Sequence, residues 1–435
     1  MVYLDLLKFV LPLVLTVIVQ EMGLQVLNGG IARVPQATET LAAYGLAWGI
    51  TMFLQGPLAQ GRQLGLVLVD SRDAFRQVQR FVLGTGLLLA GVLACLALTS
   101  VGVWVVEDIH QVSTELSNTV RRAFFWLVPI PVLAGLTRLY MGMLMRVRRT
   151  DVVGAAMIGG IVASIGSVFV LLSTDFIRED PIRLPLVATY ASALSEFVIV
   201  LWGRFRWIDL PNQSDGKPLN TVYVIRFFWP LAFIMAIQGL SRPVINLFVS
   251  RSSDGAEALA VLTVVYALGH VPYGWVNEVR SLPTAFKSIP NHLYYIRRFA
   301  LGCGLFSFGT MLLLFWTPIR DVLLQDWIGV SAHLAAICVM PLFLFSFFPM
   351  AVMVRAYFHG VGLLERRTKA LAPSAPARIV AIVAFLLIFS GQGIPSATLG
   401  IGALLSGFTF EAATVWWCIS LNLPRKSGHD EKVIL

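Results

Sequence analysis

The sequence predicts an all-α integral membrane protein with twelve transmembrane helices arranged in two six-helix bundles. Three observations lead to this fold class: the composition, the number of long apolar runs and an internal repeat. Of the 435 residues, 57% are hydrophobic and 13% are charged, and the mean hydropathy is +0.77. These values lie far outside the range of soluble globular domains.

Twelve apolar runs follow one another along the chain. A helix that crosses a hydrocarbon core of about 30 Å needs about 20 apolar residues. A membrane β-barrel would alternate polar and apolar residues, so these unbroken runs indicate helices. The first run lacks the pattern of a cleavable signal and is expected to be a retained helix. We place the spans at residues 8–29, 41–66, 81–105, 123–145, 152–173, 184–203, 223–249, 257–280, 299–317, 333–357, 370–390 and 396–421.

The distribution of basic residues predicts that both termini are cytoplasmic. In this orientation the inner segments carry nineteen Lys and Arg residues and the outer loops carry seven, as expected for a multi-pass protein of the cell membrane. The net charge of +9 is explained by these loops, so no nucleic-acid partner is expected. The four cysteines have no metal-ligand spacing, and neither a metal nor a cofactor is expected.

An internal repeat relates the two halves of the chain. The runs 8–29 and 223–249 align without a gap at an offset of 218 residues, with seven identities over 25 positions. We therefore expect two six-helix domains, residues 1–210 and 211–435, that form a parallel repeat and bind substrate between them at mid-depth. Weaker matches are Tyr44 with Tyr266, and the Glu196–Trp202 spacing with that of Glu411–Trp417. The identities are Phe9/Phe227, Pro12/Pro230, Leu13/Leu231, Gln20/Gln238, Val26/Val244, Asn28/Asn246 and Arg33/Arg251.

Polar residues inside the run 223–249 form the most conspicuous candidate site. Gln238, Arg242 and Asn246 follow at i, i+4 and i+8, so they share one helix face. Each ionisable residue at this depth costs a few kcal/mol and needs a functional or structural reason. Pro243 is expected to kink the same helix. The run 8–29 repeats the polar face with Gln20, Asn28 and, beside them, Glu21.

The run 257–280 contains a second group of polar and helix-breaking residues. After Tyr266 it continues as GHVPYGW from Gly269, so that one proline and two glycines surround His270 and Tyr273. A helix broken at this depth offers unpaired backbone groups and a hinge. The predicted hinge residues are Pro243, Gly269, Pro272 and Gly274.

These observations predict a water-accessible cavity in which Arg242 binds an anion, because a guanidinium presents a planar fork of donors to carboxylate or phosphate oxygens. The alternative is that Arg242 pairs with an internal acid, Glu21 or Glu196. Glu21 and Glu196 are also candidates for proton or sodium coupling, although a helix-to-helix hydrogen bond would explain Glu196 and Glu411. Arg355 either admits anions or extends to the interface. The predicted substrate-binding residues are Arg242, Asn246, Gln238, Asn28, Gln20, Tyr44, Tyr266, His270 and Tyr273.

Several stretches of the chain resemble the progressive ankylosis (ANK) protein family, within the multidrug/oligosaccharidyl-lipid/polysaccharide (MOP) exporter superfamily. The resemblance covers nearly the whole chain. Leu24 and Gly29 depart from the pattern, which expects Glu and Arg there, so the charge of the first helix differs. The most specific stretches are SRPVINLFVSR from Ser241, GHVPYGWVNEVR from Gly269, FSFFPMAVMVRA from Phe345, LAPSAPARI from Leu371, ATLGIGALLSGF from Ala397, QVLNGGIA from Gln25 and AAYGLAW from Ala42.

The resemblance implies a two-bundle fold similar to MATE transporters and cellular efflux of small polyanions, such as citrate and other dicarboxylates, pyrophosphate, phosphate or ATP. The short tail that ends at Leu435 suggests a bacterial relative in the inner membrane, and we expect a monomer. The expected mechanism is alternating access. The rival interpretations are a MATE-type cation or drug antiporter, which needs an acidic cavity, and a lipid-linked sugar flippase, which needs a larger cationic groove. No catalytic motif supports an intramembrane enzyme.

Overall fold

Long helices account for almost the whole of the computed structural model, which describes residues 2–110, 112–212 and 219–422. Within the first helix it describes the backbone but not the side chains of residues 18, 21, 22, 24–26 and 28. The described residues contain no β-strand, which confirms the all-α prediction. They divide into two compact units: the N-terminal unit, residues 11–228, and the C-terminal unit, residues 1–10 and 229–435.

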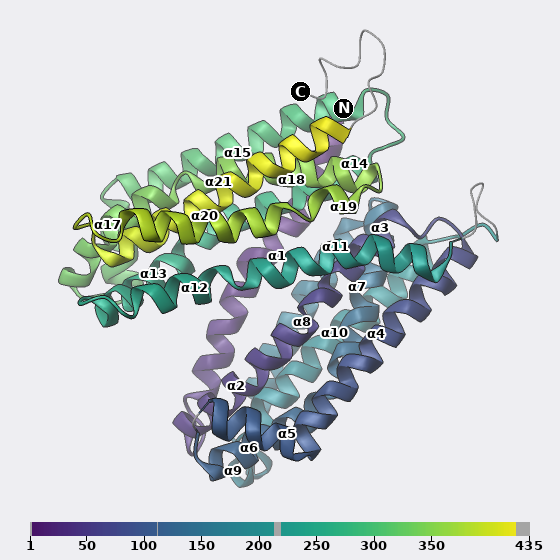
Figure 1. The fold of residues 1–435 in the computed structure, drawn as a ribbon. Helices are drawn as coiled ribbons and strands as arrows, with labels where there is room; N and C mark the ends of the chain where they lie inside the picture. The colour runs from purple at the N-terminus through teal and green to yellow at the C-terminus, as the bar shows by residue number, and fades with distance from the viewer. Residues whose placement is uncertain (1, 111, 213–218, 423–435) are drawn as a thin grey trace. The chain divides into compact units, whose positions relative to one another are not determined.

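The N-terminal unit is a bundle in which α8 packs along α10, and α7 packs against both α3 and α4 (Figure 1). Serine caps begin two of its helices: the Ser71 hydroxyl accepts a hydrogen bond from the Ala74 amide at 3.2 Å, and the Ser113 hydroxyl accepts one from the Leu116 amide at 3.4 Å. Its helices are α1 (Val2–Ile31), α2 (Ala37–Gln55), α3 (Gly61–Val67), α4 (Arg72–Leu98), α5 (Ser100–Val103), α6 (Thr114–Leu127), α7 (Ile130–Arg146), α8 (Thr150–Leu171), α9 (Asp175–Glu179) and α10 (Arg183–Trp207).

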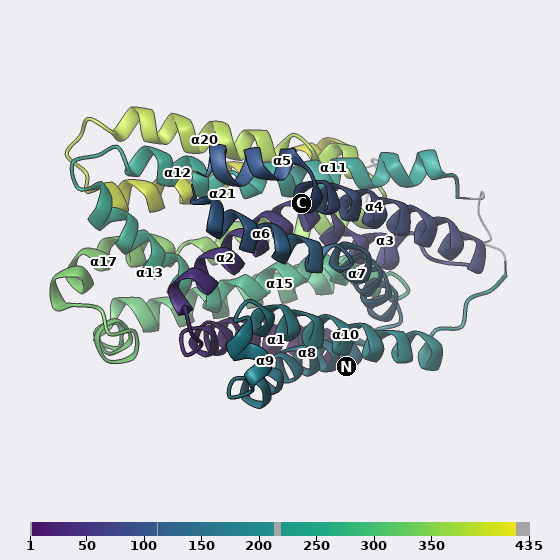
Figure 2. The same ribbon diagram turned by 90° about the horizontal axis from the view of Figure 1, so that it is seen from below.

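The C-terminal unit is a second bundle, in which α21 packs against α18 and α20. Figure 1 shows α20 beside α21 along most of its length, and Figure 2 shows the same helices from below. Its helices are α11 (Thr221–Gly239), α12 (Ser241–Val249), α13 (Gly255–Gly274), α14 (Leu282–Ala285), α15 (His292–Trp316), α16 (Ile319–Asp321), α17 (Ala332–Phe345), α18 (Phe348–Leu364), α19 (Thr368–Leu371), α20 (Ser374–Phe389) and α21 (Ser396–Asn422).

Helices α1 and α11 each belong to both units. The boundary falls after Val10 in α1 and after Phe228 in α11, and 228 − 10 is the repeat offset of 218. The Phe9 ring packs on Phe286 of the C-terminal unit, whereas the Phe228 ring packs on Phe81 of the N-terminal unit. The division predicted after residue 210 separates α10 from α11 and stays a prediction.

The repeat is visible in the helix bounds. Helices α7 and α18 differ by 218 residues at both ends, 348 − 130 and 364 − 146. Each also contains a glycine that allows close backbone contact. A Cβ at Gly142 would lie 2.0 Å from the Arg62 carbonyl oxygen, and one at Gly360 would lie 2.7 Å from the Arg280 carbonyl oxygen. Both pairs follow the same offset, so the two halves share this packing.

Prolines lie at helix breaks in several of the predicted spans, among them 333–357 beside Pro349 and 370–390 beside Pro373. Residues 41–66 were expected to form one helix, but α2 ends at Gln55, and a 3-10 segment, Gly56–Gln60, precedes α3 because Pro57 lies at its start. Residues 123–145 were likewise expected to be continuous, but α6 and α7 meet at a bend of 43° beside Pro129. The kink expected from Pro243 is present as the break between α11 and α12, since a proline clashes with the carbonyl four residues earlier.

Nine helical segments of the described residues are long and apolar enough to cross a membrane, and the bent pair of α6 and α7 would make a tenth. The protein is therefore a multi-pass membrane protein. The predicted count of twelve stays a prediction. The nine segments are Arg72–Leu98, Thr150–Leu171, Arg183–Trp207, Thr221–Val249, Gly255–Ala285, His292–Trp316, Ala332–Leu364, Thr368–Phe389 and Ser396–Leu421.

Candidate functional site

Arg242 lies on the exposed face of α12, one turn before Asn246. Its guanidinium carbon is 4.6 Å from the centroid of the Tyr266 ring on α13, a geometry in which the π-electron face attracts the cation. No carboxylate forms an ion pair with Arg242 among the described residues of this unit. The side chain of Glu21, one of the two acids expected as an alternative partner of Arg242, lies outside the described residues.

Two polar atoms on the same helices lack a hydrogen-bond partner among the described residues. They are the side-chain carbonyl oxygen of Asn246 and the hydroxyl of Tyr266, and both are buried. Buried polar groups in proteins are nearly always satisfied, so an unsatisfied pair beside a guanidinium indicates a place for water or a ligand. Arg242, Asn246 and Tyr266, all predicted from the sequence, thus form one polar group on α12 and α13.

The remaining predicted residues of α13 are packed with aromatic rings. The rings of His270 and Tyr273 meet edge to face, and Tyr273 is buried against Phe345, Phe348 and Phe408. Tyr273 is also within electrostatic range of Arg242, Arg355 and Arg378. Tyr273 therefore connects the Arg242 group to the other two guanidinium groups of the bundle.

Close packing explains the predicted hinge glycines. A Cβ at Gly269 would lie 2.5 Å from the Phe345 ring, and one at Gly274 would lie 2.8 Å from the His270 ring. Helix α13 continues through Pro272 to Gly274 and is followed by a 3-10 segment, Trp275–Ser281. The Pro272 carbonyl accepts hydrogen bonds from Ser307 at 2.6 Å and from the Trp275 indole at 2.8 Å. Hinge motion at these residues stays a prediction.

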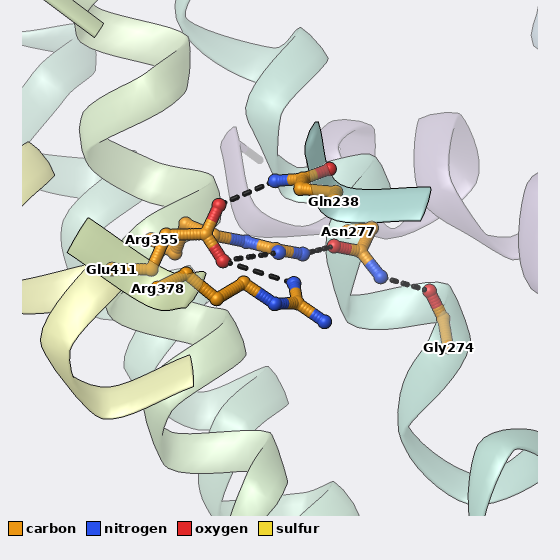
Figure 3. A network of polar contacts seen from close by, with 6 residues as sticks. All are labelled: Gln238, Gly274, Asn277, Arg355, Arg378 and Glu411. Atoms are coloured by element: carbon orange, nitrogen blue, oxygen red, sulfur yellow. Dashed lines mark hydrogen bonds and ion pairs between the residues drawn. The ribbon is translucent and has the colours of Figure 1, made fainter. Parts of the chain in front are cut away.

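A buried charge cluster lies inside the C-terminal unit (Figure 3). The Glu411 side chain of α21 is 0% exposed, and its Oε2 atom accepts hydrogen bonds from Nη1 of Arg355 on α18 and Nη1 of Arg378 on α20, each at 3.1 Å. Its Oε1 atom accepts a hydrogen bond from the Gln238 amide. Arg355 therefore lies inside the bundle in an ion pair, with its side chain 12% exposed, and does not extend to the interface.

The surroundings fix the two guanidinium groups in place. Arg355 donates to the Asn277 side-chain oxygen, and the Asn277 amide donates to the Gly274 carbonyl at 2.9 Å, as Figure 3 shows. The guanidinium carbons of Arg378 and Arg355 lie 3.9 and 5.2 Å from the centroid of the Phe408 ring. With two guanidinium groups and one carboxylate, the cluster carries one surplus positive charge.

Arg378 and the ion pairs of Glu411 were missed by the sequence interpretation. Arg378 was visible as a lone basic residue in the run 370–390, and Glu411 as a lone acid in the run 396–421. Two opposite charges in consecutive membrane helices are a signal that they meet across an antiparallel pair. Gln238, predicted to bind substrate, donates a hydrogen bond to Glu411 in this structure, and its role in binding stays a prediction.

A separate cavity of about 400 Å³ lies within the N-terminal unit. Its lining includes the predicted residues Gln20, Tyr44 and Glu196 together with Arg138 and Ser192. The Tyr44 hydroxyl is hydrogen-bonded to the Thr189 hydroxyl at 2.8 Å. The structure thus brings three of the predicted residues together. The side chains of Glu21 and Asn28, also predicted, lie outside the described residues.

Glu196 lies at the wall of this cavity. The Ser192 hydroxyl is 3.5 Å from its Oε1 atom, and Arg138 is within electrostatic range. Helix α8 passes it at Gly160, where a Cβ would lie 2.6 Å from the Glu196 Cγ atom. The glycine therefore provides the space that the Glu196 side chain occupies.

The model of the progressive ankylosis protein (ANKH) family matches residues 1–317. The MATE transporter ClbM in complex with Rb+ superposes with a TM-score of 0.70 at 14% identity, covering 100% of this chain and 97% of that one. A mutant of the Vibrio cholerae MATE transporter VcmN gives 0.70 at 15% identity, with 98% of each chain covered. A MOP superfamily transporter from Pyrococcus furiosus, described as having a binding pocket of reverse polarity, gives 0.64 at 14%, covering 95% and 94%. These likenesses show the MATE-like fold.

Proposed function

The chain belongs to the progressive ankylosis protein family, and we propose that it is an alternating-access transporter that exports small polyanions. The proposed substrates are citrate and other dicarboxylates, pyrophosphate or phosphate, and nucleotides such as ATP. They share two or more negative charges and several oxygen acceptors. The binding residues that we propose are Arg242, Asn246 and Tyr266, with Tyr273 and His270 beside them.

The observation that carries this proposal is the excess of positive charge among the membrane helices of the C-terminal unit. Arg242, Arg355 and Arg378 lie around Tyr273, and Glu411 is the carboxylate that pairs with two of them. Three positive charges and one negative charge leave a net charge of +2. Charges inside the membrane are costly, so a surplus of one sign favours a ligand of the opposite sign.

The membrane potential can supply the energy for export. Moving one negative charge outward across an inside-negative membrane releases about 2.3 kcal/mol per 100 mV, so a trianion gains roughly three times as much. A coupled ion is therefore not required by the energetics. Where coupling occurs, Glu196 in the N-terminal cavity and Glu21 are the proposed acids.

A cation or drug antiporter is the second candidate, because the fold is that of MATE transporters and the N-terminal cavity contains Glu196. Such an antiporter would be expected to present an acidic binding surface. The net charge of +2 carried by Arg242, Arg355, Arg378 and Glu411 argues against it. Transport of a lipophilic cation by the purified protein, with no transport of anions, would favour this candidate.

Flux into proteoliposomes tests the proposal. Vesicles with an imposed potential would be supplied separately with radiolabelled citrate, phosphate, pyrophosphate and ATP. We expect Arg242→Gln to reduce the flux of transported anions at least about tenfold, since a hydrogen bond to a charged group is worth about 1.5–3 kcal/mol. Arg251→Gln, exposed just beyond the end of α12, is the matched control. Undiminished flux of every anion in Arg242→Gln would remove Arg242 from the site.

A further inference from the structure

We propose that Glu411 occupies the position of a substrate anion on Arg355 and Arg378, that a polyanion displaces its carboxylate, and that Glu411 takes up a proton from water as it leaves. This inference rests on the proposed transport of anions. It adds an anion subsite inside the C-terminal unit and a proton that accompanies binding. The ligand class is a di- or trianion with carboxylate or phosphate oxygens.

The two guanidinium groups hold more donors than Glu411 uses. A guanidinium has five N–H donors in a fork suited to bidentate binding. Here Nη1 of Arg355 and Nη1 of Arg378 both reach the same Oε2 atom at 3.1 Å. The Nε atom of Arg378 is buried and has no hydrogen-bond partner among the described residues. A ligand with more oxygen atoms would therefore satisfy this pair better than one carboxylate does.

Charge leads to the same conclusion. Glu411 neutralises one of the two guanidinium charges and leaves a surplus of +1 inside the bundle. A dianion in its place would bring the pair to neutrality. The Gln238 amide, which now donates to Glu411, offers a further donor at the same position.

Displacement requires a proton because of where Glu411 lies. Its side chain is fully buried, and a buried carboxylate without a cationic partner is strongly disfavoured. The charged or titratable groups that face it are Arg355 and His359 on α18 and Arg378 on α20, with Tyr273 on α13 and Arg242 on α12 beyond them; α11 contributes the neutral Gln238. A neutral carboxyl can stay in this environment, because the Gln238 amide can accept its proton in a hydrogen bond.

Proton uptake on binding is the direct test. Pyrophosphate would be titrated calorimetrically into the purified full-length protein in buffers of different ionisation enthalpy, so that protons taken up per anion can be counted. We expect wild type to take up about one proton more than Glu411→Gln, as linkage requires for a group that is ionised only in the free state. Protons that the pyrophosphate itself takes up or releases are the same with both proteins, so they cancel in the difference between wild type and Glu411→Gln. Glu257→Gln, which alters the contact with His333 at the start of α13, should match wild type.

A second measurement detects the protonated carboxyl directly. Infrared difference spectra of the wild-type protein should show a protonated carboxyl band when pyrophosphate is added, and that band should be missing in Glu411→Gln. Pyrophosphate binding with equal proton counts and no such band overturns the inference and leaves the proposed transport intact. Failure of pyrophosphate, citrate, phosphate and ATP to bind or to cross the membrane in wild type overturns the proposed function itself.

Discussion

Glu411 and Glu196 occupy matching positions in the two halves of the chain, yet their surroundings are opposite. Glu411 is sealed between two guanidinium groups, whereas Glu196 faces a cavity of about 400 Å³. The helices that carry them, α21 and α10, each pack against a partner, α20 and α8. The duplicated fold has thus kept the acid in both halves and changed what faces it.

Two substitutions contribute to the difference. At the repeat offset of 218, Arg378 of α20 corresponds to Gly160 of α8. At the offset of 215 that relates Glu411 to Glu196, Phe408 corresponds to Ala193, which lines the cavity. A guanidinium and a phenyl ring in one half are replaced by a hydrogen atom and a methyl group in the other. The comparison teaches that the N-terminal half has small residues at two positions where the C-terminal half carries side chains of the Glu411 cluster.

Truncation of the two acids should give the largest contrast. Glu411→Ala would leave two buried guanidinium groups without their carboxylate, and we expect it to lower the free energy of unfolding by about 3–5 kcal/mol. Glu196→Ala removes a weaker contact at a cavity wall and should cost about 1 kcal/mol. Unfolding in detergent, followed by circular dichroism, measures both. Equal losses would mean that the two environments are energetically alike.

Filling the space at Gly160 should have a smaller effect. Gly160→Ala places a Cβ 2.6 Å from the Glu196 Cγ atom and 3.0 Å from the Ser192 hydroxyl, so both side chains must move, at a cost of about 1–3 kcal/mol. Gly166→Ala on the same helix is the matched control, because nothing lies within 4 Å of its added Cβ. Thermal unfolding of the two variants compares them. If Gly160→Ala is as stable as Gly166→Ala, Glu196 does not depend on this space.

The starts of α21 and α10 provide the smallest and most pH-dependent contrast. Hydrogen bonds from the Ser396 amide and hydroxyl to Asp254 hold the pKa of that carboxyl below its ordinary value. A lowered pKa means that the ionised carboxylate stabilises the fold above the ordinary value of about 3.9 and that this contribution is lost as the pH falls through the folded-state value. Asp254→Asn should therefore cost about 1 kcal/mol at neutral pH.

A pH series of thermal unfolding from 7 to about 3 checks this sign. The difference between wild type and Asp254→Asn should shrink toward the acid end. Before α10, Asp180 instead forms ion pairs with Arg183 at 3.4 Å and Arg122 at 3.5 Å, so the effect of Asp180→Asn should shrink when salt is added. A difference for Asp254→Asn that grows on acidification would contradict the assignment.

The sequence allowed much of the fold to be predicted, because composition and periodicity act locally along the chain. Unbroken apolar runs indicated helices, and the offset found between the runs 8–29 and 223–249 reappears in the bounds of α7 and α18. The breaks at Pro57 and Pro129 were missed, because a proline can either remain within a membrane helix, as Pro12 does in α1, or interrupt it.

The candidate site was less predictable. Arg242 and Asn246 could be assigned to one face by their spacing, and the structure places them on α12 beside Tyr266. The cluster around Glu411 depends on how α18, α20 and α21 rotate and pack, and no local pattern determines that rotation. Gln238 illustrates the limit: its position in the membrane was clear, but its contact with a carboxylate 173 residues away was not.

The first residues of α1 and of α11 belong to a different unit from the rest of their helices, and this affects where the chain can be cut. A cut in the loop after α10 would leave the first residues of α1 on the fragment that lacks Phe286, and the first residues of α11 on the fragment that lacks Phe81. Each fragment would then need the other to complete its own aromatic packing. The two fragments would therefore have to associate to complete their packing. Co-expressing the fragments would be the way to rebuild the protein.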